Sequence, residues 1–153
     1  MLKKLLASVL VTGYATAIAA VPPPDLRQSV ETDQALTCAA VLQTTGRVLF
    51  VSPLRPEAER SKDLVLMYLL RQVWVDKSIA LGAASGNVDQ LVTERVSSAP
   101  TKEQYSHCSK TALERYRLMP DTEKEKLHEA AASSLGTYLD WAEKQHKLQT
   151  KGP

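Results

Sequence analysis

Apolar residues recur along most of this chain at spacings that place them on one side of a helix. The densest stretch is 63–84, in which seven consecutive apolar residues at 64–70 are followed by Val73-Trp74-Val75. At a helical period these side chains fall on nearly every face, which is typical of a helix that is buried all round. The longest apolar run is far shorter than the about 20 residues of a membrane span. The pattern therefore predicts the central helix of a folded core, beginning near Glu57.

Four further segments carry a helical pattern with one apolar face. Gly46 could end the first of them and leave Arg47–Val51 as a β-like run, but no second strand is evident for it to pair with, so we interpret 30–52 as one helix. The further predicted helices are 30–52, a short one opened by Asn87 and Gln90, one opened by Thr101 and Gln104, and a last one from Thr122 and Glu125 to Leu148. The fold class is therefore an all-α bundle of four to five helices.

The first twenty residues have the composition of a secretory signal peptide. Lys3 and Lys4 make a basic start, residues 5–18 are mostly apolar, and Ala17-Ile18-Ala19 has the small-residue pattern of a cleavage site. We therefore expect a periplasmic or secreted protein; the alternative, an N-terminal membrane anchor, is disfavoured because the apolar segment is short. The predicted organisation is a signal peptide at 1–20, an extended proline-rich leader at 21–29, a single helical domain at 30–148 and a frayed tail at 149–153.

Removal of the signal peptide makes the chain electrically neutral. It takes away two lysines and no acids, so the number of Lys and Arg residues falls from 19 to 17, against 17 Asp and Glu. The charges are interspersed, and no basic stripe of the kind that binds nucleic acid is present. We therefore expect no nucleic-acid partner, and no integral membrane span in the mature chain.

The chain has two cysteines, Cys38 and Cys108. In an exported protein an even number of cysteines is typical of disulfide bonding. Each lies on the apolar face of its predicted helix, so we predict one bond that closes the bundle by joining the first helix to the helix that begins near Thr101. The alternative is a free nucleophilic thiol, but neither cysteine lies in a C-x-x-C or another recognised nucleophile pattern.

The spacing of polar residues indicates neither a catalytic nor a metal site. His128 and His146 are 18 residues apart, about 27 Å along one helix, and cannot chelate one ion together. The chain has no H-E-x-x-H, no G-x-S-x-G and no glycine-rich phosphate loop. We therefore expect no catalytic residues, no metal and no cofactor.

Arg71 and Trp74 are the candidate partner-binding residues. They share a stripe of the central helix with Met67 and Ser78. An arginine beside an indole can bind a carboxylate or another anionic group, and both residue types are frequent anchors in protein interfaces. The alternative is structural, with Trp74 and Met67 in the core and Arg71 at its rim, its aliphatic stem on the aromatic face.

Two classes of function remain open, and a small exported enzyme is a third. The first is a non-catalytic binding protein that recognises another envelope or extracellular protein, such as an inhibitor, an immunity factor or an envelope accessory. The second is a helical bundle that senses a small molecule or a metal in its core. A large exposed apolar or Arg/Trp patch would favour the first class, and an enclosed cavity would favour the second.

Overall fold

The computed structural model describes residues 24–95 and 99–150, with side chains from 29 to 95 and from 99 to 147. This part of the chain is all-α, as predicted, and contains no strand. None of its helices combines the length and the apolar character that a membrane crossing requires. The elements are α1 (Pro24–Val51), α2 (Glu57–Ala80), the 3-10 turn η1 (Ser85–Asn87), α3 (Val88–Glu94), α4 (Lys102–Leu118) and α5 (Asp121–Thr150).

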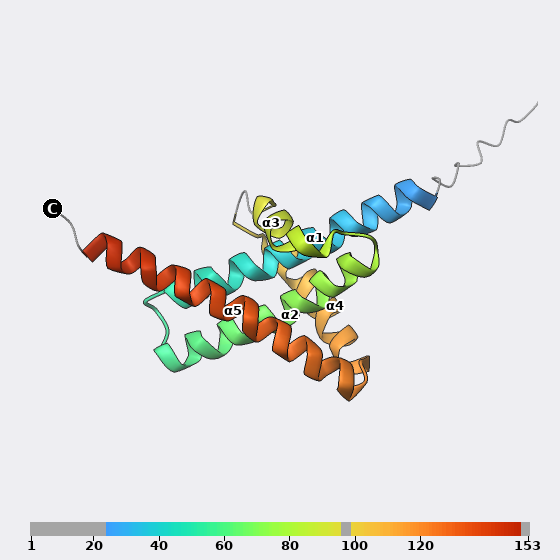
Figure 1. Ribbon diagram of the computed structural model, residues 1–153. Helices are drawn as coiled ribbons and strands as arrows, with labels where there is room; N and C mark the ends of the chain where they lie inside the picture. The colour runs from blue at the N-terminus through green and yellow to red at the C-terminus, as the bar shows by residue number, and fades with distance from the viewer. Residues whose placement is uncertain (1–23, 96–98, 151–153) are drawn as a thin grey trace, which may run out of the picture.

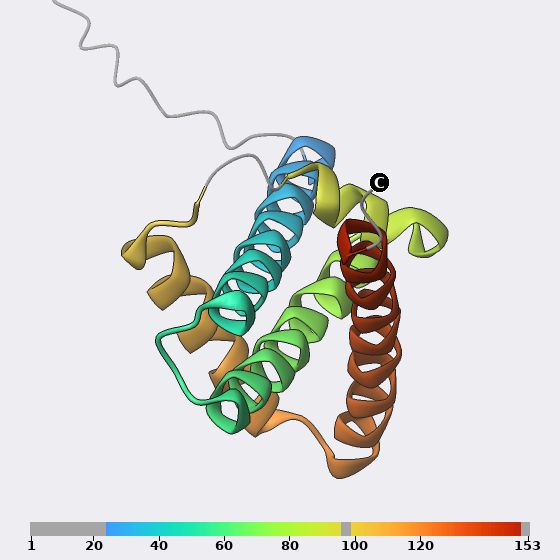
Figure 2. The same ribbon diagram turned by 90° about the vertical axis from the view of Figure 1, so that its left-hand side faces the viewer.

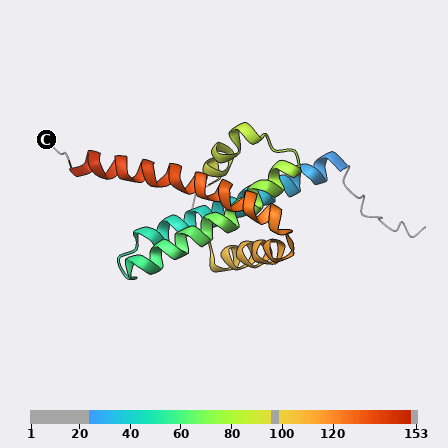
Figure 3. The same cartoon turned by 60° about the horizontal axis from the view of Figure 1, so that its bottom comes forward.

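The three long helices α1, α2 and α5 lie side by side, with α2 in the middle and antiparallel to the other two (Figures 1 and 2). The α1/α2 pair forms a central layer. The helix α4 packs on one side of this pair, and α3 and α5 lie on the other (Figure 3). Most of the buried core comes from α1 and α2, to which α3, α4 and α5 add a few side chains each. The expectation of a central helix at the position of α2 is therefore confirmed.

A glycine allows α1 and α2 to approach closely. Gly46 faces Met67, and a Cβ atom built on Gly46 would lie 2.8 Å from Met67 Cβ. The helix α1 continues through this glycine, so Arg47–Val51 is helical rather than a strand. Its last turn packs on α2, where Arg60 donates a 2.8 Å hydrogen bond to the Phe50 carbonyl. This bond satisfies one of the carbonyls that a helix leaves unpaired at its C-terminus.

The predicted disulfide between Cys38 and Cys108 is present and links α1 to α4. The two Cα atoms are 5.2 Å apart, and both residues are buried. Trp74 of α2 packs in the same cluster, and its indole N–H donates a 3.0 Å hydrogen bond to the Cys108 carbonyl. The disulfide and this hydrogen bond together hold α4 against the α1/α2 pair.

The ends of the helical region differ from the prediction. The helix α1 begins at Pro24, inside the segment 21–29 that we expected to be an extended leader. Proline suits the first helical position, because its fixed φ is compatible with a helix and an N–H there has no intrahelical partner. At the other end α5 continues to Thr150, two residues into the predicted tail. The signal peptide, residues 21–23 and residues 151–153 lie outside the described residues.

One of the three predicted capping pairs is confirmed. Thr101 and Gln104 form a reciprocal capping box, with hydrogen bonds of 3.2 and 2.9 Å, at the start of α4. Asn87 precedes α3 but makes no side-chain capping bond. Thr122 does not cap α5 either, because this helix already begins at Asp121.

Candidate functional site

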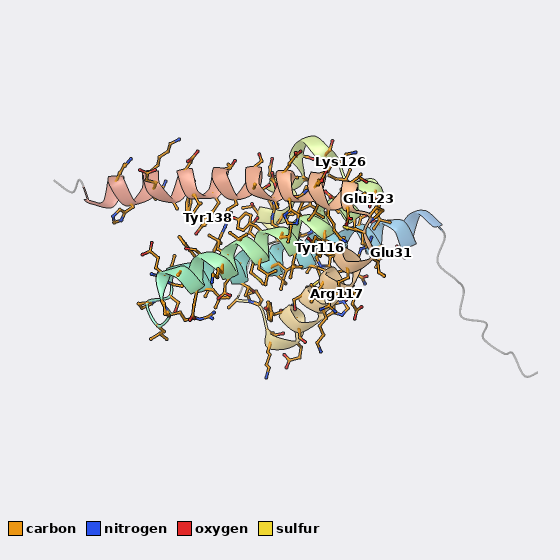
Figure 4. All side chains as sticks on the ribbon, turned by 90° about the horizontal axis from the view of Figure 1, so that it is seen from below. Glu31, Tyr116, Arg117, Glu123, Lys126 and Tyr138 are labelled. Carbon is orange, nitrogen blue, oxygen red and sulfur yellow. A yellow bond between two sulfur atoms is a disulfide. The ribbon has the colours of Figure 1, made fainter. Side chains whose placement is uncertain are left out.

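A cleft of about 420 Å³ lies between the α1/α2 pair and the two helices α3 and α5. Tyr138 extends into this region from α5, towards α2 (Figure 4). The lining combines cationic, amide, hydroxyl and aromatic side chains, and we name it the arginine cleft. Its residues are Gln43 and Arg47 of α1, Tyr68 and Arg71 of α2, Asp89 and Thr93 of α3, and Ser134, Thr137, Tyr138 and Trp141 of α5.

Arg71 is the buried charge of the arginine cleft, with only 2% of its surface exposed. Its Nε donates a 2.8 Å hydrogen bond to Gln43 Oε1, and its Nη2 forms an ion pair with the Asp89 carboxylate. The guanidinium carbon lies 5.8 Å from the centroid of the Tyr68 ring, within the range of a cation–π contact. A buried charge of this kind is tolerated only where nearby groups compensate it, and here Asp89 supplies the counter-charge.

Two N–H-bearing atoms in this network are buried and unpaired. Gln43 Nε2 and Arg71 Nη1 have no hydrogen-bond partner among the described residues, although both side chains are almost fully buried. A buried donor without a partner costs about 1–3 kcal/mol. Both atoms belong to side chains that line the arginine cleft, so a ligand acceptor that reaches them would remove this penalty.

Arg47 adds a second positive charge at a half-buried position. Its Nε donates a 3.2 Å hydrogen bond to Tyr68 Oη, and its guanidinium carbon lies 4.4 Å from the centroid of the Tyr138 ring. Burial raises the pKa of the Tyr68 and Tyr138 hydroxyls, and the nearby Arg47 partly offsets that rise. Both phenols therefore stay neutral at physiological pH. A neutral phenol that accepts from Arg47 can still donate its own proton to a ligand.

Aromatic rings lead from the base of the arginine cleft to its rim. The ring centroids of Tyr68 and Tyr138 are 5.9 Å apart, and those of Tyr138 and Trp141 are 6.1 Å apart; both pairs are stacked. Trp141 is 55% exposed, whereas Tyr138, which lies on the same side of α5, is buried. A ring with one exposed face can pack against the apolar part of a ligand.

The charges that line the arginine cleft favour an anion. Arg47 and Arg71 contribute two positive charges and Asp89 one negative charge, which leaves one net positive charge. Among the described residues, no group of three His, Cys, Asp or Glu side chains is placed to hold a metal ion. The arrangement offers N–H and O–H donors and aromatic faces, which can bind an anionic group and an apolar ring.

The two predicted site residues lie in different parts of the molecule. Arg71 lines the arginine cleft, whereas Trp74 is 4% exposed and lies beside the disulfide. Trp74 borders a second hollow, of about 570 Å³, together with Lys77, whose Nζ lies 5.2 Å from the centroid of the indole. The N–H of Trp74 is already used by the Cys108 carbonyl, so this tryptophan has no donor left for a ligand.

The sequence interpretation missed the α1 and α5 sides of the arginine cleft. Gln43 and Arg47 are spaced four residues apart, and this spacing was a signal that both share one face of α1. The tyrosines Tyr68 and Tyr138 gave no comparable signal, because their position in a helical apolar stripe is equally typical of core residues.

The chain matches no protein-family model, no curated protein and no solved structure. A functional assignment therefore has to come from the chemistry of the arginine cleft.

Proposed function

We propose that this protein is an exported, non-catalytic binding protein that holds the anionic group of a small-molecule ligand in the arginine cleft. The observation that carries the proposal is the pair of buried, unpaired atoms, Gln43 Nε2 and Arg71 Nη1, in side chains that line a cleft with a net positive charge. An anionic acceptor would satisfy these donors, and charge-assisted hydrogen bonds are stronger than neutral ones.

The dimensions and the lining of the arginine cleft support a small molecule. Its volume of about 420 Å³ lies within the usual range of ligand pockets. Tyr138 and Trp141 would pack against the apolar part of the ligand, while Arg47 and Arg71 would bind its charge. This division of roles is common in small-molecule sites, where a few polar groups set the orientation.

A protein partner is the second candidate, as for an inhibitor, an immunity factor or an envelope accessory. The specific observation is the exposure of Trp141 at the rim of the arginine cleft, where it is 55% exposed. Tryptophan is among the residue types that contribute most to protein interfaces. On this alternative Trp141, and not the buried Trp74, would be the aromatic anchor beside Arg71.

Export rests on the signal-peptide pattern at 1–20 and is supported by the disulfide. A bond between Cys38 and Cys108 is suited to an oxidising compartment such as the periplasm or the extracellular space. Protein recovered from its native compartment should begin near Ala20 or Val21, which N-terminal sequencing would establish.

The test is calorimetric titration of the mature protein with benzoate, acetate and inorganic phosphate. We expect at least one of these anions to bind, and Arg47→Ala to weaken its binding by about tenfold, the loss of one charge-assisted hydrogen bond. Arg55→Ala is the matched control. Arg55 lies in the loop that connects α1 to α2, where it is exposed and pairs with Glu59 and Asp63 outside the arginine cleft. If none of the anions binds, or if both variants lose affinity equally, the proposal is wrong.

The protein-partner alternative has its own measurement. Immobilised mature protein would be exposed to an envelope extract, and retained proteins would be identified by mass spectrometry. Loss of a retained protein in Trp141→Ala, but not in Leu118→Ala, would favour the second candidate. Leu118 is 86% exposed and does not line the arginine cleft, so it controls for the loss of an exposed apolar side chain.

A further inference from the structure

Asp89 places a carboxylate of the protein itself against the charge of the arginine cleft. It lies in the first turn of α3, and its Oδ1 pairs with Arg71 Nη2. The two side chains differ sharply in burial, since Arg71 is 2% exposed and Asp89 is 69% exposed. The carboxylate therefore reaches the buried guanidinium from the solvent side.

The contact between Asp89 and Arg71 uses only part of what the guanidinium offers. An arginine can bind both oxygens of a carboxylate through two N–H groups, which is the stronger geometry. Here Nη2 is paired with Asp89, while Nη1 on the same guanidinium is unpaired among the described residues. Gln43 Nε2 is a further unpaired donor next to this group, since Gln43 Oε1 accepts from Arg71 Nε.

The helix that carries Asp89 is lightly held. It has seven residues, of which Val88 and Val92 are buried. Beyond its C-terminus, Arg95 donates a 2.7 Å hydrogen bond to Asp33 of α1, an ion pair at the surface. Surface ion pairs contribute little to stability. A carboxylate that is already mostly hydrated loses little when it leaves Arg71 for water, so Asp89 can be exchanged for another carboxylate.

We propose that Asp89 occupies the carboxylate subsite of the arginine cleft, and that the ligand is a carboxylic acid that displaces Asp89 from Arg71. This inference rests on the proposed function and specifies its ligand. The incoming carboxylate binds Arg71 through Nη1 and Nη2 and accepts from Gln43 Nε2. Removal of Asp89 leaves two positive charges in the cleft, which the ligand carboxylate then partly neutralises.

The apolar part of the ligand lies against the aromatic rings of the arginine cleft. Tyr138 and Trp141 are stacked between its base and its rim, so a flat ring attached to the carboxylate fits them best. A free aromatic acid and the C-terminal carboxylate of a peptide that ends in an aromatic residue share this chemistry. N-acetylphenylalanine and a short peptide ending in phenylalanine, each with its C-terminal amide as control, distinguish the two sources by their relative affinity.

The deciding experiment measures benzoate binding to the folded mature protein and to Asp89→Asn. We expect Asp89→Asn to bind benzoate about fivefold more tightly, because the competing carboxylate is gone and a partly exposed ion pair is worth up to about that factor. Benzamide, which has the same shape without the charge, should bind weakly to both proteins. Asp33→Asn is the matched control: it removes the other ion pair that secures α3, with the same change of charge, and should leave benzoate affinity unaltered.

A second measurement needs no variant. Asp89→Asn leaves Arg71 without its counter-charge and can lower stability, so hydrogen exchange of the α3 amides is followed in the wild-type protein. Saturating benzoate should speed exchange in Val88–Glu94 as Asp89 is released, while the α1 and α2 amides exchange no faster.

The outcomes separate this inference from the proposed function. If phosphate binds and benzoate does not, or if Asp89→Asn binds benzoate equally or more weakly while folded, the carboxylate subsite is wrong but anion binding stands. Benzoate binding without faster exchange in α3 also overturns the displacement of Asp89. If no anion binds to either protein, the proposed function itself fails.

Discussion

A Cβ atom added at Gly46 would lie 2.8 Å from Met67 Cβ, so any larger residue there must push α1 away from α2. Met67 Cβ is fixed to the backbone of α2 and cannot rotate away. We therefore expect Gly46→Ala to lower the free energy of unfolding by about 1–3 kcal/mol, the usual range for overpacking. The measurement is urea denaturation followed by tryptophan fluorescence.

Gly136 is the matched control for this prediction. It also lies within a helix, but nothing lies within 4 Å of the position of its added Cβ. Alanine has a higher helix propensity than glycine, so Gly136→Ala should raise the free energy of unfolding by about 0.5–1 kcal/mol. Equal and small effects at both positions would mean that the helices can separate at no cost.

At the same scale, the sequence predicted the burial of apolar side chains better than the burial of polar ones. Gln43 is 2% exposed, although glutamine is usually a surface residue. Gln43 accepts a hydrogen bond from Arg71, which lies 28 positions later in the chain. No local sequence pattern relates two residues so far apart. Trp141 is the reverse case, because this large apolar side chain lines the arginine cleft and is 55% exposed.

At the scale of the element, helix positions and the starts of α2 and α4 were predictable, whereas only one of the three predicted capping pairs is present. The pattern located α2 and α4 closely, because long periodic segments reveal their own apolar faces. A capping bond depends on the backbone geometry of one residue. The presence of a polar residue at a helix boundary does not determine that geometry. Thr101 adopts the extended backbone that a capping side chain needs, with ψ of 161°, whereas Asn87 has ψ of 14° and makes no capping bond.

The capping difference gives a paired prediction. Thr101→Ala removes the hydroxyl that accepts from the Gln104 N–H, and should lower the free energy of unfolding by about 1 kcal/mol. Asn87→Ala removes no capping bond and should change stability by less than about 0.5 kcal/mol. Both values come from urea denaturation of the mature protein. A loss at Asn87 as large as the loss at Thr101 would contradict the assignment of the single capping box.

At the scale of the whole molecule, the helical bundle and its disulfide were predictable from the sequence, and the arginine cleft was not. The amphipathic faces predict the helices of the bundle. The even number of cysteines predicts a disulfide between two of those helices. The cleft instead depends on how far α5 stands from the α1/α2 pair and on where the loops place α3. Its lining residues come from four helices, and no local pattern relates them.

The helix α4 lies on one side of the α1/α2 pair, and α3 and α5 lie on the other (Figure 3). The disulfide joins α1 to α4, and the arginine cleft lies on the side of α3 and α5. The disulfide spans 70 positions, and closing a loop of this length stabilises the fold by about 4 kcal/mol in the chain-entropy model. Cys38→Ser, Cys108→Ser and the double variant should therefore lose similar stability, since either single change removes the whole bond.

Binding should respond differently from stability in these variants. The arginine cleft is formed by α1, α2, α3 and α5, and α4 contributes no residue to its lining. At a temperature where the double cysteine variant is fully folded by circular dichroism, its affinity for benzoate should equal that of the wild type. Arg47→Ala should show the opposite behaviour, with weaker binding and a smaller loss of stability. If loss of the disulfide weakens binding as much as Arg47→Ala does, the cleft depends on α4, and the two sides of the molecule are coupled through the α1/α2 pair.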